Sequence, residues 1–202
     1  MDSKRHLARI RWEVLAKQIG SRYADCTLEG FECGLPKQRE AVASLQRFID
    51  AMPGNIQAGA GVFLYGPVGT GKDHLLSALM RAATQRGAYV RWLNGLDLFG
   101  AIRDLMSSRG DEANFIEQYT TVGVLAISDP FSGRSELTPH QIDMLSRIID
   151  GRYRTNRATW ITANLTDRKD AEKRLGIPIT DRLGHGSLSV HCNWPSYRRA
   201  GA

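Results

Sequence analysis

The sequence contains little cysteine and no long apolar run. Its three cysteines, Cys26, Cys33 and Cys192, are odd in number and lack the paired spacing of a zinc site, so we expect free thiols. No stretch of about 18 apolar residues occurs, which excludes a membrane-spanning helix of the usual length. The charged N-terminus continues into Arg9 and Arg11 rather than into an apolar segment, which argues against a secretory signal. These absences predict a cytoplasmic protein with no membrane partner.

Length and charge favour one domain that meets a polyanion. With 202 residues, 42% of them apolar, the chain can bury the core of a single domain. The formal net charge is +6, and arginines gather at Arg152, Arg154 and Arg157. This excess favours a nucleic-acid partner in addition to any nucleotide. The alternative is that these arginines only solvate a helix face.

The segment from Val62 to Leu75 is the most informative part of the chain. It predicts a buried strand, a glycine-rich turn and an amphipathic helix, which is the order of a phosphate-binding loop. Glycine is needed in such a turn because backbone N–H groups must approach phosphate oxygens closely, and the helix N-terminus adds a positive dipole. The alternative is that the glycines only form a tight turn between the strand and the helix and bind no ligand. A match to so long a pattern, with the strand and helix in the right order, makes this alternative weaker. We predict that ATP or ADP contacts Gly66, Pro67, Val68, Gly69, Thr70, Gly71, Lys72, Asp73 and His74.

Two positions depart from the usual magnesium-binding pattern. The residue after the loop lysine is normally Ser or Thr, whose hydroxyl ligates Mg²⁺, but here it is Asp73. The later apolar run 122–127 ends in Ser128 and Asp129, where two acids are usual. The loop thus has an acid where a hydroxyl is usual, and the strand end has a hydroxyl where an acid is usual. This reciprocal exchange leaves two interpretations open. Either Asp73, Ser128 and Asp129 form the metal site, or the site has decayed and hydrolyses nucleotide slowly.

The remainder of the chain alternates helices with strands. Pro36 begins a predicted helix that Pro53-Gly54 ends, and Ile177-Pro178 is predicted to form a turn. The other predicted helices cover residues 4–19, 72–86, 96–107, 112–120, 139–153 and 170–175, and the predicted strands cover 62–65, 89–93, 121–128, 158–163 and 187–191. This alternation predicts an α/β fold with a parallel five-stranded sheet covered by helices on both faces.

Several motifs accompany the glycine-rich loop in a fixed order. They are Gly66–Leu75, Ile149–Arg154, Trp160–Leu165, Asp181–Leu183 and Asn193–Arg198. Together they resemble the AAA+ ATPase domain of bacterial replicative helicase loaders of the DnaC/DnaI type, to which IstB-like transposition helper ATPases are related. The resemblance implies a P-loop AAA+ domain over residues 21–202, lacking a full C-terminal helical lid because few residues follow the last motif. That family often carries a polar residue other than Ser or Thr after the loop lysine.

The resemblance also implies roles for individual side chains. Asn164 would be the first sensor, orienting water near the γ-phosphate; the alternative is a cap for the next helix. Arg182 would be an arginine finger that reaches the nucleotide of a neighbouring subunit; the alternative is a surface ion pair with Asp181 or another neighbour. With Asp129 these two residues form the predicted catalytic set, and Arg198 is a further candidate contact.

The expected partners follow from the same resemblance. An extra helix pair, predicted at 96–107 and 112–120, lines a channel for single-stranded DNA in initiator and loader ATPases, and here it carries Arg103, Arg109, Phe99 and Phe115. The two phenylalanines fit a core role better than a DNA contact. Residues 1–20 supply one helix as a partner-binding segment, for a replicative helicase or for a different protein.

The resulting functional hypothesis is a nucleotide switch. It would bind ATP and Mg²⁺ at the interfaces of a homo-oligomer, help load a replicative helicase on single-stranded DNA, and have weak or DNA-stimulated ATPase activity. Two alternatives stay open at this point. One is a transposition helper ATPase that assembles on duplex DNA, and the other is a non-hydrolysing, nucleotide-sensing adaptor with a degenerate metal site.

Overall fold

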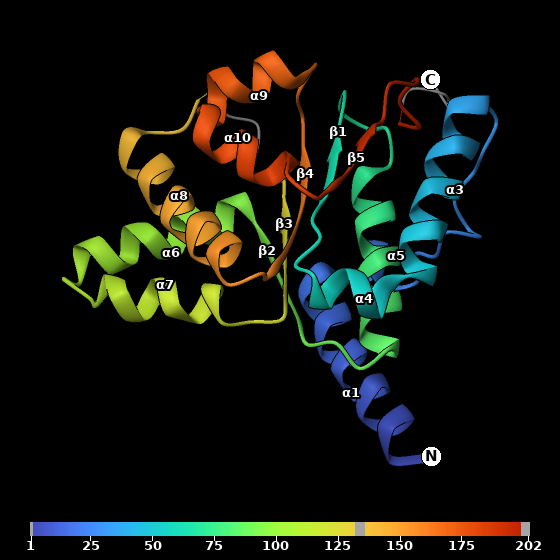
Figure 1. The fold of residues 1–202 in the computed structure, drawn as a ribbon, viewed down its shortest axis with the longest axis horizontal. Helices are drawn as coiled ribbons and strands as arrows, with labels where there is room; N and C mark the ends of the chain where they lie inside the picture. The colour runs from blue at the N-terminus through green and yellow to red at the C-terminus, as the bar shows by residue number, and fades with distance from the viewer. Residues whose placement is uncertain (1, 132–135, 199–202) are drawn as a thin grey trace.

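A parallel five-stranded sheet runs through the centre of the protein (Figure 1). In the computed structural model, which describes residues 2–131 and 136–198, the strand order is β2-β3-β4-β1-β5. The strands are β1 (Val62–Tyr65), β2 (Val90–Asn94), β3 (Val124–Ser128), β4 (Ala158–Ala163) and β5 (Leu188–His191). The predicted sheet is confirmed, while the last four residues of the expected ATPase domain lie outside the described residues.

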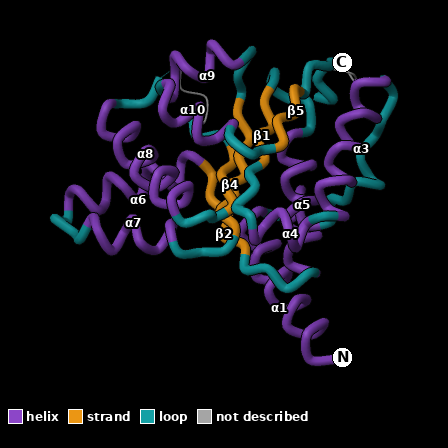
Figure 2. Tube along the Cα trace, viewed as in Figure 1, coloured by secondary structure: helices purple, strands orange, loops and turns teal. Residues whose placement is uncertain are grey.

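Helices cover both faces of this sheet, as predicted. Figure 1 places α1 (Asp2–Ile19), α3 (Pro36–Asp50), α4 (Met52–Gln57) and α5 (Lys72–Gln85) on one side. The other side carries α6 (Gly95–Ser107), α7 (Glu112–Thr120), α8 (Pro139–Arg154), α9 (Arg168–Leu175) and α10 (Ile177–Gly184). Figure 2 shows the strands between these two helical layers.

Each face of the sheet has its own apolar core. Trp160 of β4 belongs to the cluster beneath α3 and α5, while the next residue, Ile161, belongs to the cluster beneath α6 to α10. This alternation follows from the period of two in a strand. All residues of β3 and β4 are buried. β3 is an apolar run up to Ser128, as expected of a strand covered on both faces, whereas β4 also buries Thr159 and Thr162.

The proline-based boundaries were wrong in two places. Pro53-Gly54 does not end a helix but lies in the first turn of α4, and Ile177-Pro178 begins α10. Proline at the first helical positions lacks only an N–H that would have no partner in the helix, so it starts helices as readily as it ends them. A short helix, α2 (Ser21–Ala24), lies between α1 and α3, where the sequence predicted no helix.

Helix α1 packs on α5 and β2 through only part of its apolar surface. Leu15 and Ile19 are buried in the core, whereas Leu7, Ile10 and Val14 are 47%, 42% and 54% exposed. The separation of residues 1–20 as a partner-binding segment stays a prediction.

Two findings concern the cysteines and the lengths of the apolar helices. Cys26, Cys33 and Cys192 are free cysteines. Across residues 2–131 and 136–198, no helix combines the length and the apolar character needed to cross a membrane.

Candidate nucleotide-binding site

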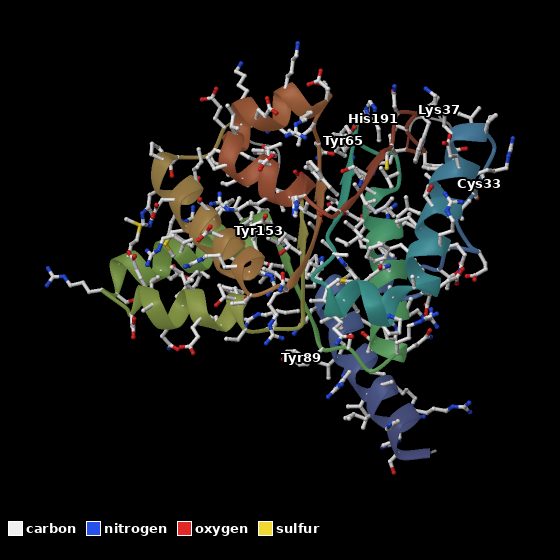
Figure 3. All side chains as sticks on the ribbon, in the orientation of Figure 1. Cys33, Lys37, Tyr65, Tyr89, Tyr153 and His191 are labelled. Atoms are coloured by element: carbon white, nitrogen blue, oxygen red, sulfur yellow. The ribbon has the colours of Figure 1, made fainter. Side chains whose placement is uncertain are left out.

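The glycine-rich loop lies at the carboxyl end of β1 and leads directly into α5. Gly66, Gly69 and Gly71 have φ values of +144°, +83° and +83°. A Cβ on Gly66 would lie 2.6 Å from the carbonyl oxygen of Cys192, so no side chain fits there. Figure 3 shows Tyr65 and His191 side by side where β1 and β5 end, and their rings stack with centroids 4.6 Å apart.

A cavity of about 690 Å³ opens beside this loop. Among the predicted nucleotide contacts, its lining includes Val68, Gly69, Gly71, Lys72, Asp73 and His74. Asp129, Asn164 and Arg198 also line it, so the structure brings most of the predicted site residues to one place. Thr70 is fully buried beneath the loop, where its Oγ1 donates to the Pro67 carbonyl at 3.0 Å.

Lys72 is held at the mouth of the loop by backbone acceptors. Its Nζ donates to the Gly66 and Pro67 carbonyls at 3.0 and 2.7 Å. Burial lowers the pKa of Lys72, and Asp73 and Asp129 are among the groups that oppose this shift. A phosphate would give this ammonium charged acceptors in place of neutral carbonyls, which adds the attraction between opposite charges to each hydrogen bond.

Asp73 meets the hydroxyl groups of two adjacent strands. Its Oδ1 accepts hydrogen bonds from Ser128 Oγ at 2.8 Å and from Thr162 Oγ1 at 2.9 Å. Ser128 and Thr162 are register partners at the ends of β3 and β4, so the sheet presents both hydroxyls together. The sequence singled out Asp73 and Ser128 but missed Thr162, although a threonine near the end of an apolar strand is a polar signal of the same kind.

The carboxylate of Asp73 and the hydroxyl oxygens around it suit a magnesium ion as ligands. Carboxylate and hydroxyl oxygens are ligands that Mg²⁺ prefers, and this ion is usually held by one or two carboxylates plus phosphates and water. Within the described part of the chain, no group of three or more His, Cys, Asp or Glu residues forms a metal-binding cluster. The residues therefore fit a site that the nucleotide's own phosphates would complete.

Asp129 and Asn164 contact each other at the edge of the same cavity. Asn164 Nδ2 donates to Asp129 Oδ2 at 2.7 Å, and the Asp129 N–H donates to the Thr162 carbonyl at 3.0 Å. The alternative role for Asn164 as a helix cap is wrong, because Asp167 caps α9 by accepting from the Asp170 N–H. Asp129 has a φ of +39°, an uncommon backbone conformation that Asp tolerates better than most residues.

Aromatic side chains from both ends of the chain cover the loop. The Phe31 ring lies edge-on to the rings of His74 and Tyr197, with centroids 5.3 and 5.6 Å apart. Trp194 Nε1 donates to the Thr70 carbonyl at 2.8 Å, and the Tyr197 N–H donates to the Gly69 carbonyl at 3.0 Å. The contact of Trp194 with the loop joins residues 124 positions apart in the chain, which a single sequence does not display.

Arg182 lies away from this cavity. It projects from α10 and pairs with Asp150 of α8, with 2.8 Å between Nη2 and Oδ1. Asp181, the partner considered first from the sequence, instead pairs with Arg168 at 3.6 Å. The pair with Asp150 is an ion pair of the kind named as the alternative. A position outside its own nucleotide cavity also fits an arginine finger that acts on a neighbouring subunit, and the finger role stays a prediction.

Arg152 is not part of a DNA-facing cluster, which corrects the reading of the basic segment. Its side chain is fully buried and donates to Thr159 Oγ1 at 3.0 Å and to the Tyr119 and Val122 carbonyls at 2.6 and 3.0 Å. Burial lowers the pKa of Arg152 to about 9, so the group stays charged at neutral pH. Its role is to tie the segment between α7 and β3 to β4.

The paired helices α6 and α7 lie between β2 and β3 in the chain, as predicted. Phe99 and Phe115 are 2% and 7% exposed and belong to the core, which confirms the core interpretation for both. Arg103 and Arg109 are exposed, and Arg109 lies at the connection between the two helices. A DNA contact by these arginines stays a prediction.

The fold and the site together define a class of protein, a P-loop nucleotide-binding domain of the AAA+ type. Within that class, the chain belongs to the family described as IstB-like ATP binding protein, whose model matches residues 37–201. It is 27% identical over 178 residues to the replicative helicase loader DnaC of Escherichia coli K12, covering 87% of this chain and 70% of DnaC.

Two further similarities were found. An ATP-binding protein of an insertion sequence in Mycobacterium tuberculosis is 30% identical over 149 residues, which cover 71% of this chain and 57% of that protein. A crystal structure of the DnaC helicase loader superimposes with a TM-score of 0.75 at 24% identity, covering 85% of this chain and 99% of that one. The sequence-based resemblance to the DnaC and IstB group is therefore confirmed.

Proposed function

We propose that this protein is an ATP-dependent switch that helps load a replicative helicase on single-stranded DNA. The observation that carries the proposal is the grouping of Lys72, Asp73, Asp129 and Asn164 around one cavity beside the glycine-rich loop. A cation, a metal ligand, a carboxylate and a polar amide are the groups that recognition of a nucleoside triphosphate needs. Sequence similarity to the helicase loader DnaC supports the partner.

The binding roles follow the geometry of the cavity. Lys72 and the loop N–H groups would hold the phosphates, while Asp73, Ser128 and Asp129 would hold Mg²⁺. Magnesium, when bound, would neutralise charge on the phosphates. Asp129 and Asn164 are hydrogen-bonded to each other and would orient water together. Arg182 would contact the nucleotide of the adjacent subunit in a homo-oligomer.

Helix α1 is the candidate contact for the helicase. Leu7, Ile10 and Val14 remain exposed on it although its other side is packed on α5. Three apolar residues at spacings of three and four form one stripe on a helix, the pattern by which helices dock on partner proteins.

A second candidate function is that of a transposition helper ATPase. It is favoured by the IstB-like family match and by the similarity to the insertion-sequence protein of M. tuberculosis. A non-hydrolysing adaptor is favoured by Asp73 and Ser128, which depart from the usual metal-binding residues. Steady-state ATPase assays with and without single-stranded DNA distinguish this adaptor from a hydrolysing switch.

Nucleotide binding is tested first. Lys72→Ala should lower ATP affinity by about tenfold or more, the size expected from losing charged hydrogen bonds of roughly 1.5–3 kcal/mol. Lys173→Ala, on the exposed surface of α9, is the matched control and should leave affinity unchanged. Unchanged affinity in a folded Lys72→Ala protein would contradict the proposal.

The partner is tested by co-purification of tagged protein with the replicative helicase in the presence of ATP. Retention of the helicase supports the loader, and its loss in a Leu7→Ser, Val14→Ser variant would support docking through α1. No retention, together with ATP-dependent assembly on duplex DNA, would instead support the transposition helper.

A further inference from the structure

A second cavity lies at the opposite end of the sheet from the nucleotide site. It has a volume of about 410 Å³ and is lined by residues that directly precede strands, among them Gly61 before β1 and Ser187 before β5. The glycine-rich loop, in contrast, follows the carboxyl end of β1. Tyr153, labelled on α8 in Figure 3, lines this cavity, well apart from Tyr65 and His191.

This cavity is strongly basic. Its lining includes Arg154, Arg157 and Arg182 together with His185, and none of the described lining residues is acidic. The His185 ring lies edge-on to Tyr153, with centroids 5.6 Å apart, which holds the imidazole at the rim. Three arginines line this one space, and planar guanidinium groups bind phosphate through paired hydrogen bonds.

One acid from outside the cavity holds two of these arginines. Asp150 Oδ1 lies 2.8 Å from Arg182 Nη2, and Asp150 Oδ2 lies 2.9 Å from Arg154 Nε. Arg157 is exposed, and no described ion pair includes it. One carboxylate is therefore shared by two arginines, and the site retains an excess of positive charge.

We propose that Arg154, Arg157 and Arg182 form a second phosphate-binding site, which the terminal phosphate of ATP held by a neighbouring copy of this chain enters. Asp150 is a latch that holds Arg182 and Arg154 until that phosphate replaces it. The inference rests on the proposed function and adds to it two phosphate contacts and a regulatory acid.

The energies favour such an exchange. Arg154 is 72% exposed in its pair with Asp150, and exposed pairs contribute only about 0.2–1 kcal/mol. A phosphate carries more charge than a carboxylate and offers oxygens to several guanidinium groups at once. The Arg182–Asp150 pair is only 31% and 28% exposed, so Asp150 competes weakly for Arg154 and more strongly for Arg182. Removal of the Asp150 charge should favour the incoming phosphate.

If Asp150 had a purely structural role, removing its charge would weaken assembly rather than strengthen it. The Asp150–Arg182 pair joins α8 to α10, so its loss would disorder Arg182 and weaken any contact that Arg182 makes with a neighbour. The latch predicts stronger assembly after Asp150→Asn, because the carboxamide keeps the shape and a hydrogen-bond acceptor but loses the competing charge.

The test is sedimentation velocity of the full chain with a non-hydrolysable ATP analogue. Asp150→Asn should lower the protein concentration at half-assembly by roughly two- to fivefold, the range that corresponds to an exposed pair. Asp181→Asn is the matched control, since it makes the same charge change on α10 and its partner Arg168 lies outside the cavity. Arg157→Ala should raise the half-assembly concentration.

Each outcome is decisive. Equal half-assembly concentrations for Asp150→Asn and Asp181→Asn, or weaker assembly of Asp150→Asn, would overturn the role of Asp150 as a latch but not the proposed function. Titration with single-stranded DNA in the absence of nucleotide gives the second comparison: tighter DNA binding by Asp150→Asn with unchanged assembly would assign the site to nucleic-acid phosphates and overturn the neighbouring nucleotide as its source. Failure of the unmodified chain to bind the analogue or assemble would overturn the proposed function as well.

Discussion

The carboxylate of Asp73 accepts a hydrogen bond from Ser128 at 2.8 Å, across 55 residues of sequence. In the usual pattern a hydroxyl follows the loop lysine and an acid ends the strand; here both groups are present with their positions exchanged. The contact between the two exchanged residues favours a compensated metal site over a decayed one, because it holds the carboxylate and the hydroxyl next to each other, where both could bind the same ion.

The first prediction reverses this exchange. Ser128→Asp alone places a second carboxylate against Asp73, where the two like charges repel each other, and Asp73→Thr alone removes the only acid of the pair. Each change should therefore weaken magnesium-dependent ATP binding by about tenfold, or about 1.4 kcal/mol. The double variant restores one acid and one hydroxyl and should recover most of the affinity. Titration of a fluorescent ATP analogue with and without Mg²⁺ measures this. A double variant no better than the worse single variant would rule the exchange out.

The second prediction concerns stability. Arg152→Met leaves the acceptors at Tyr119, Val122 and Thr159 buried without their donor, which should lower the free energy of unfolding by about 3 kcal/mol or more. Arg154→Met, at an exposed position two residues later, should cost less than about 1 kcal/mol. Urea unfolding measures both. Similar losses for the two variants would show that Arg152 is not a structural group.

The third prediction concerns the aromatic cover of the loop. Trp194→Phe keeps an aromatic ring but removes the N–H that holds the Thr70 carbonyl, so it should cost about 1 kcal/mol of stability and lower ATP affinity. Trp160→Phe is the control, because the Trp160 indole bonds to Ala60 at 3.4 Å, away from the nucleotide cavity. Equal effects of the two changes on ATP titrations would show that Trp194 contributes only to packing.

The fourth prediction concerns DNA. Replacing Arg103 and Arg109 by Ala should weaken single-stranded DNA binding and reduce its log–log salt slope by roughly 0.7 for each phosphate that is no longer neutralised. Arg39→Ala with Arg47→Ala, on α3 in the opposite helical layer, makes the same charge change as a control. Weaker binding with an unchanged slope would mean that Arg103 and Arg109 act through folding or assembly.

The sheet and the loop could be predicted because their signals are local. A buried parallel strand is a continuous apolar run, and the glycine pattern between Gly66 and Gly71 specifies its own backbone conformation. The same holds for the core positions of Phe99 and Phe115, which follow helical periodicity.

Other features depended on long-range contacts. The pairing of Ser128 with Thr162 is set by strand register, and the Asp150–Arg182 pair by the packing of α8 on α10, neither of which a single sequence displays. Arg152 was wrongly grouped with Arg154 and Arg157 because an arginine inside a basic segment usually faces solvent. The helix boundaries at Pro53 and Pro178 were predicted wrongly because proline is found at helix starts as well as after helix ends.

The central claim is that ATP is shared between two subunits, and mixing two inactive variants tests it most directly. Lys72→Ala lacks the cation of the loop, and Arg182→Ala lacks the finger but keeps its own loop. We expect each variant alone to fail in ATP-dependent assembly measured by sedimentation velocity, and a mixture to recover it partly, because intact Lys72 and intact Arg182 then meet across an interface. No recovery at any mixing ratio, with both variants folded, would contradict the shared site.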